Sequence, residues 1–116
     1  MIKIMVKDLC QYAIFEQDGI RLREEILKYY GKGDTITLDF TDISLFATMF
    51  FNASIGWLVL KDGAEVVSNN IIYTNLSVLG QATWKHSFEN AVEVRANPLY
   101  KKALANYTDE NQEEEF

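Results

Sequence analysis

The sequence predicts a single domain of the α/β class. Short runs rich in β-branched and aromatic residues alternate along the chain with longer stretches in which apolar residues recur at helical spacing. Parallel strands need a connection long enough to return the chain to the same edge of the sheet, and that connection is usually a helix. The order strand, strand, helix, strand, helix, strand, helix therefore indicates parallel strands joined by crossover helices, in a sheet that is mixed at its N-terminal edge.

Two short strands are predicted at the start of the chain. Residues 2–6 alternate between large aliphatic residues and other residues, and Ile14 with Phe15 forms a second apolar stretch. A turn near Lys7 and Asp8 would lie between them.

A helix and a strand follow, separated by a turn that contains two glycines. Asp18 can accept hydrogen bonds from the free amides of a first helical turn, and apolar residues continue from it at helical spacing as far as Tyr29 or Tyr30. Residues 31–34 end this helix, because glycine tolerates the left-handed conformation that is common at helix ends. Residues 35–40 place isoleucine, leucine and phenylalanine on one face, which predicts a strand.

Residues 45–60 predict a helix that is buried on most sides, because apolar residues occupy two of its neighbouring faces. This stretch contains three polar residues and a glycine and is shorter than the roughly 20 apolar residues that span a bilayer, so we expect no membrane helix. Residues 71–74 are typical of a strand, whereas residues 65–68 have no predicted element.

Two helices are predicted in the last part of the chain, over residues 79–94 and from the Asn97–Pro98 pair to about residue 106. We expect one domain over residues 1–107 and an acidic, disordered tail over residues 108–116.

The charge and the cysteine content limit the classes of function. A formal charge of −6, from 11 basic and 17 acidic residues, argues against a nucleic-acid surface, which needs clustered lysines and arginines. Cys10 is the only cysteine, so the chain can form neither an internal disulfide nor a thiolate metal cluster. The N-terminus has no cationic, apolar leader, and we expect a cytoplasmic protein that binds no metal, cofactor or membrane.

Catalytic signatures are incomplete. Residues 31–34 lack the longer glycine frame of a phosphate-binding loop and the Ser or Thr after its lysine. His86 is the only histidine, which excludes metal sites with several histidines. A hydrolase with Asp39 or Asp42 as its base would require His86 to approach the end of the strand. We therefore expect no enzymatic activity.

Polar residues gather where the strand over residues 35–40 ends and the next helix begins. Asp39, Asp42, Ser44 and Thr48 surround the edge of the sheet at which ligands and partners of α/β domains bind. On these residues alone a structural interpretation is the stronger one. Asp42 and Ser44 would form a turn, and Ser44 or Thr48 would cap the helix.

Three segments resemble a known family. Residues 18–26 (DGIRLREEI), 37–43 (TLDFTDI) and 46–52 (FATMFFN) are similar to the STAS-like family of small bacterial proteins, relatives of the anti-sigma factor antagonists. The family pattern has a helix that begins near G-x-x-L-R, a strand that ends in L-D-F-x-x-V, and a serine-rich turn before a phenylalanine at a helix start. The resemblance implies a four- or five-stranded sheet with helices mainly on one face, and a docking role.

The resemblance also implies a phosphorylation site. In the antagonists, a serine of the turn D-S-S-G is phosphorylated by a partner of the histidine-kinase-like ATPase superfamily, and the added charge abolishes binding. Aligning that turn with this chain places Ala47 at the aspartate, Thr48 and Met49 at the serines, and Phe50 at the glycine. Thr48 alone keeps a hydroxyl and is the candidate phosphorylation site.

The leading hypothesis is a regulatory protein-binding module that docks through the turn and helix start after the central strand. Its polar contacts would be Asp42, Ser44, Thr48 and Asn52, and its apolar contact Met49. The partner would be another protein, for which the resemblance suggests a histidine-kinase-like ATPase. The alternative is a small-molecule or nucleotide-binding module on the same sheet edge, since some relatives of this fold bind purine nucleotides or lipids.

Overall fold

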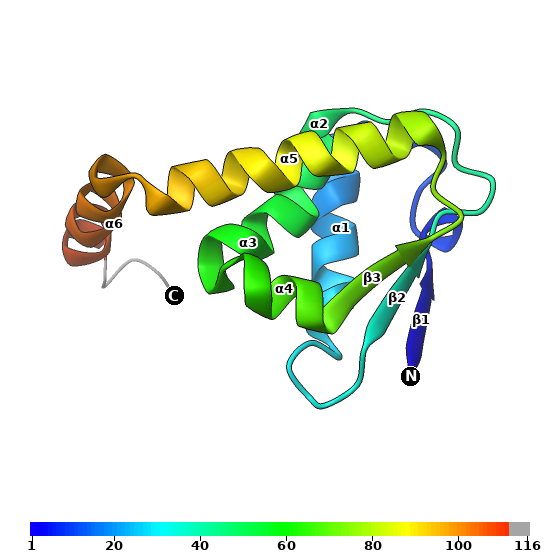
Figure 1. Ribbon diagram of the computed structural model, residues 1–116, viewed down its shortest axis with the longest axis horizontal. Helices are drawn as coiled ribbons and strands as arrows, with labels where there is room; N and C mark the ends of the chain where they lie inside the picture. The colour runs from blue at the N-terminus through cyan, green and yellow to red at the C-terminus, as the bar shows by residue number, and fades with distance from the viewer. Residues whose placement is uncertain (112–116) are drawn as a thin grey trace.

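The fold is built on one small parallel sheet. The computed structural model describes the backbone of residues 1–111 and the side chains of residues 1–105. Its strands are β1 (Ile2–Met5), β2 (Ile36–Asp39) and β3 (Ile71–Thr74), in the order β1-β2-β3 (Figure 1). Both strand pairs are parallel, which confirms the α/β class and the crossover connections.

Helices make every connection between the strands. The crossover from β1 to β2 contains α1 (Glu16–Leu27), and the crossover from β2 to β3 contains four consecutive helical pieces. These are α2 (Thr48–Phe51), the π-helical segment η2 (Asn52–Gly56), α3 (Trp57–Asp62) and α4 (Ala64–Asn70). After β3 the chain forms the long helix α5 (Val78–Ala96) and then α6 (Pro98–Asn111).

The two faces of the sheet differ in character. The pairing register aligns Ile36 with Ile2 and Ile71, and aligns Leu38 with Ile4, so aliphatic side chains line one face. These residues join buried side chains of α1, α3 and α4 in one hydrophobic core, and Figure 1 shows the helices on that side of the sheet. The expectation that helices lie mainly on one face is therefore met by the part of the chain that the structure describes.

Close helix packing in this core depends on small residues. A Cβ on Gly19 of α1 would overlap the carbonyl oxygen of Phe50 and would lie 2.9 Å from the Cβ of Ala53. A Cβ on Gly56 would lie 3.2 Å from Oγ of Ser87 in α5. The helical segment from α2 to α3 is therefore held tightly between α1 and α5.

The predicted four or five strands and the mixed N-terminal edge are not confirmed. The described residues form three parallel strands, and Ala13 makes only an isolated parallel bridge to Phe46. The chain leaves β1 through a 3₁₀ turn, η1 (Val6–Asp8), in which the amide of Leu9 donates to Val6 O at 2.9 Å. Since this turn leads on to α1, which begins at Glu16, residues 14 and 15 form no strand, and β1 pairs only with β2 in the described residues.

The helix predicted over residues 45–60 begins later than expected. Residues up to Ala47 stay extended, with φ −139° and ψ 149° at Ala47, because the bridge to Ala13 holds them. Residues 65–68, which had no predicted element, belong to α4. The last helix is longer than expected, since α6 ends at Asn111, and residues 112–116 of the predicted tail lie outside the described residues.

Candidate functional site

The carboxyl ends of the three strands meet at one edge because all strands are parallel. Asp39 ends the central strand there, and only 2% of it is exposed. Its Oδ1 accepts hydrogen bonds from the amide of Thr41 at 2.9 Å, from the Thr41 hydroxyl at 2.6 Å and from Nδ2 of Asn75 at 3.1 Å. Lys3 of β1 places its ammonium 3.2 Å from Oδ2. Asp39 thus links β1, through Lys3, to the turn after β2 and to the residue that follows β3.

Asp39 is ionised and structural. The Thr41 hydroxyl, followed by Asn75, the Thr41 amide and Lys3, holds the pKa of the Asp39 carboxyl far below its ordinary value. His86 lies exposed on α5, and it is not among the hydrogen-bond partners of Asp39 in the described residues. Asp39 therefore fixes the turn after β2 through these partners.

The turn that follows β2 exposes two of the predicted site residues. Asp42 has φ +68°, a left-handed conformation that aspartate tolerates better than most residues. Its Oδ2 pairs with Nζ of Lys7 at 3.1 Å, and both side chains are largely exposed. Ser44 is also exposed.

The capping interpretation of Ser44 and Thr48 is wrong. The residue at the N-cap of α2 is Ala47, and no side chain accepts a hydrogen bond from the free amides there. Thr48 is the first residue of α2 and is half-buried, and Met49 next to it is 54% exposed. The hydroxyls of Ser44 and Thr48 are therefore not used to start the helix.

Asn52 has a different environment from the other predicted contacts. It lies in η2, where its Oδ1 accepts a hydrogen bond of 2.6 Å from the buried hydroxyl of Ser87 in α5. The structure brings Asp42, Ser44, Thr48 and Met49 to the end of the sheet, whereas Asn52 ties η2 to α5.

Several exposed apolar residues at this edge were missed by the sequence interpretation. The bridge between Ala13 and Phe46 joins two segments, with hydrogen bonds from Ala13 N to Leu45 O at 3.1 Å and from Ala47 N to Ala13 O at 2.9 Å. Gly80 of α5 lies against Phe46 as well, since a Cβ there would be 3.0 Å from the Phe46 ring. The exposed large apolar residues of these three segments, which we name the apolar rim, are Tyr12 (37%), Phe15 (57%), Leu45 (47%), Met49 (54%), Val78 (85%) and Leu79 (57%).

Periodicity could not have revealed the apolar rim, because a sequence does not distinguish an exposed apolar residue from a buried one. Val78 and Leu79 directly follow Ser77, whose side chain accepts a hydrogen bond from Gly80 N and caps α5. The sequence signal for the apolar rim is this pair of large apolar residues in the first turn of a helix, directly after a capping serine.

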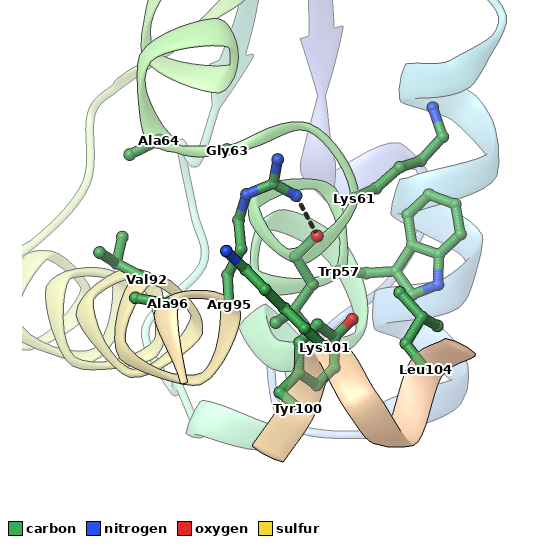
Figure 2. A pocket seen from close by; sticks show the side chains of 11 residues that line it. Trp57, Lys61, Gly63, Ala64, Val92, Arg95, Ala96, Tyr100, Lys101 and Leu104 are labelled. Atoms are coloured by element: carbon green, nitrogen blue, oxygen red, sulfur yellow. Dashed lines mark hydrogen bonds between the residues drawn. The ribbon is translucent and has the colours of Figure 1, made fainter. Parts of the chain in front are cut away.

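A cavity of about 710 Å³ lies away from the sheet edge, between α3, α5 and α6 (Figure 2). Apolar side chains make up most of its wall, and its charged lining residues are Lys61, Arg95 and Lys101. Arg95 donates from Nη1 to Leu60 O at 2.6 Å, while Lys61 is directed elsewhere, with Nζ 3.6 Å from a carboxylate oxygen of Asp62. The small-molecule alternative placed its site at the sheet edge, whereas this cavity lies at the other end of α5 (Figure 1).

The described residues contain no group of three or more histidine, cysteine, aspartate or glutamate side chains placed to hold a metal ion. Within the same part of the chain, no helix is both long enough and apolar enough to cross a membrane.

A parallel sheet with helices on one face, a polar edge at the strand ends and an apolar rim beside it define a small α/β domain. Residues 18–81 match the family described as STAS-like domain of unknown function (DUF4325). The match covers more than half of the chain and includes most of α1, then β2, the helices from α2 to α4, and β3. The chain therefore belongs to this family of STAS-like domains. Comparisons with curated proteins and with solved structures gave no significant match.

Proposed function

We propose that the chain is a regulatory protein-binding module that docks its partner through the apolar rim and the turn after β2. The observation that carries the proposal is the presence of six exposed large apolar side chains on three segments, of which two are joined by the Ala13–Phe46 bridge and the third approaches Phe46 through Gly80. Contiguous exposed apolar surface with polar residues at its border is typical of protein interaction sites. Asp42, Ser44 and Thr48 supply that polar border.

The partner that best suits this surface is a protein with an apolar patch of its own. The family resemblance makes an ATPase of the histidine-kinase-like superfamily the first partner to test. Phosphorylation of Thr48 would add about 1.5 to 2 negative charges next to Met49, and burying that charge against an apolar partner surface is unfavourable. Thr48 would then switch docking off.

Binding of a purified candidate ATPase to variants of the rim tests this proposal. Met49→Asp and Thr48→Glu should each weaken binding at least about tenfold, because each buries a charge in the interface. The matched control is Leu99→Asp in α6, a residue that is 74% exposed and lies outside the rim. Circular dichroism spectra of all three variants should equal that of the unaltered chain.

Equal binding by Met49→Asp and the Leu99→Asp control would reject the docking surface. If Met49→Asp weakens binding and Thr48→Glu does not, the surface stands and the switch at Thr48 is rejected.

A second candidate function is the binding of a small anionic molecule in the cavity between α3, α5 and α6. Its apolar wall and its basic lining residues, with no acidic one among them, suit a ligand that combines an anionic group with an apolar body. Thermal melting with laurate, decanol and a nucleotide panel tests it, because a ligand at 100 times its dissociation constant adds about 2.7 kcal/mol of stability. Stabilisation by laurate that Lys101→Glu removes would support this function, and an unchanged melting temperature with every compound would reject it.

A further inference from the structure

The outer edge of β3 carries unpaired backbone groups. The amide of Phe40 donates to Thr74 O at 3.0 Å, so the backbone groups of Thr74 face β2. Successive residues of a strand direct their N–H and C=O groups to opposite sides. The backbone groups of Ile72 therefore also face β2, and the backbone groups of Ile71 and Tyr73 face outward. In the described part of the chain β3 pairs only with β2, which leaves these outward groups without a strand.

This edge lacks the features that usually protect an edge strand. No charged residue occurs over residues 66–84, and 47% of Ile72 and 38% of Tyr73 are exposed. Charged side chains on an edge strand normally discourage pairing with another chain, and the opposite edge strand β1 carries Lys3.

Helix α5 leaves the edge of β3 open. A groove of about 340 Å³ lies between β3 and α5, lined by Ile72, Tyr73, Trp84 and Phe88 among others. The Tyr73 and Trp84 rings meet edge to face with their centroids 4.9 Å apart. An added strand would therefore find apolar surface beside its backbone partners.

We propose that β3 pairs with β3 of a second copy of this chain, antiparallel, around a two-fold axis through Ile72. A two-fold axis perpendicular to the sheet keeps each face of the sheet on the same side, so a residue on one face pairs with a residue on that same face. Pairing Ile72 with Ile72 of the second copy places Ile71 opposite Tyr73 of the second copy, and the reverse. Ile71 and Tyr73 are the residues whose backbone groups face outward. Each of the two Ile71–Tyr73 pairs exchanges two backbone hydrogen bonds, which makes four in all.

The alternative antiparallel register is less favourable. It would pair Tyr73 with Tyr73 of the second copy, which gives two backbone hydrogen bonds. The next outward-facing residue, Ile71, would then have to pair with Asn75 of the second copy. Asn75 has φ +56°, lies beyond β3 and cannot continue a strand. The register centred on Ile72 is therefore the self-complementary one.

Charge complementarity selects this face for self-association. Two copies with a formal charge of −6 each repel one another over most of their surface. Beside the edge of β3, by contrast, α5 carries Lys85 and Glu89, one turn apart on the wall of a second groove of about 430 Å³. The two-fold axis reverses the direction of α5, so the proposed dimer would present Lys85 and Glu89 of the two copies in opposite order, which favours pairing of unlike charges.

Light scattering after size-exclusion chromatography tests the dimer. The unaltered chain should have twice its chain mass of 13.3 kDa at high protein concentration. Ile72→Glu and Ile72→Lys should each be monomeric, because either change places like charges opposite one another at the two-fold axis. An equal mixture of the two variants should recover the dimer mass, because opposite charges then face each other. Leu45→Glu is the matched control, since Leu45 is also 47% exposed, and it should remain dimeric.

An unaltered chain that stays at 13.3 kDa over the whole concentration series would overturn the proposal and leave the edge for a strand of a different protein. Dimers formed by both single variants, or a mixture that stays monomeric, would overturn the Ile72 register. These outcomes do not involve the apolar rim as a docking site, so they are independent of the proposed function.

Discussion

At the scale of single residues, Asp39 is held by four polar contacts. It is buried at the end of β2 and holds Thr41, Asn75 and Lys3 through one carboxylate. An ionised buried group must have such partners, because removing it from water without them is costly. The carboxylate therefore stabilises the turn that belongs to the proposed docking surface.

Asp39→Asn should lower the free energy of unfolding by about 1 to 3 kcal/mol at pH 7, because hydrogen bonds to a charged acceptor become bonds to a neutral one. The folded-state pKa of Asp39 is depressed. Its contribution is therefore complete above the unfolded-state pKa of about 3.9, and it is lost as the pH falls toward the lower folded-state value. Urea unfolding at pH 7 and at pH 3 should show the difference between the two proteins narrowing at pH 3.

The control is Asp42→Asn, because Asp42 is exposed and pairs only with Lys7 in the described structure. It should change stability by less than about 0.5 kcal/mol at either pH. An Asp39→Asn effect that is as large at pH 3 as at pH 7 would contradict an ionised Asp39.

Cys10 should be a slow nucleophile. Burial, followed by the nearby Asp18 carboxylate, raises the pKa of Cys10 to about 11. Iodoacetamide should therefore alkylate the folded chain at pH 8 roughly a hundredfold more slowly than it alkylates the urea-unfolded chain. Equal rates in the folded and unfolded chains would mean that the thiol is not shielded as the structure indicates.

At the scale of elements, the helical segment from α2 to α3 positions the proposed docking surface. Its start contains the half-buried Thr48 and the exposed Met49, and its π-helical part packs between α1 and α5. Gly19 allows α1 to approach the Phe50 carbonyl without a Cβ between them. The orientation of the exposed helix start therefore depends on a close contact between two buried helices.

Gly19→Ala should destabilise the fold by about 1 to 3 kcal/mol even though alanine favours a helix more than glycine does. The added Cβ would overlap backbone atoms, which cannot move aside as a flexible side chain can. Glu24→Ala, at an exposed position of the same helix, should stay within about 0.5 kcal/mol of the unaltered chain. Denaturant unfolding of both variants measures the difference, and a stabilising Gly19→Ala would refute the close packing.

The first N-terminal strand, the central strand and the long helix after β3 were predictable from the sequence, and the second N-terminal strand was predicted wrongly. The strand predicted over residues 35–40 corresponds to β2, and the helix predicted over residues 79–94 to α5. The alternation at residues 2–6 could not reveal that the chain continues into a 3₁₀ turn instead of a hairpin, because both begin with the same apolar residues. The polar residues at the edge of the sheet were predicted from the sequence. The apolar rim was not, because whether an apolar side chain is exposed depends on how the chain packs.

At the scale of the whole molecule, two of the apolar surfaces that the described chain exposes are the proposed contact sites. These are the apolar rim and the open edge of β3, which lies beside α5. A net charge of −6 repels other acidic chains, so contacts with them are favoured where uncharged residues lie on the surface.

The most direct test of the docking role is site-specific photo-cross-linking inside cells that make the protein. A photoreactive amino acid at Met49, in the apolar rim, is compared with the same amino acid at Leu99, which is exposed on α6. The proposed function predicts a discrete adduct of higher mass from Met49, lost when Thr48→Glu is added, and no such adduct from Leu99. The same adduct from both positions, or none from Met49, would contradict a partner-binding surface at the end of the sheet.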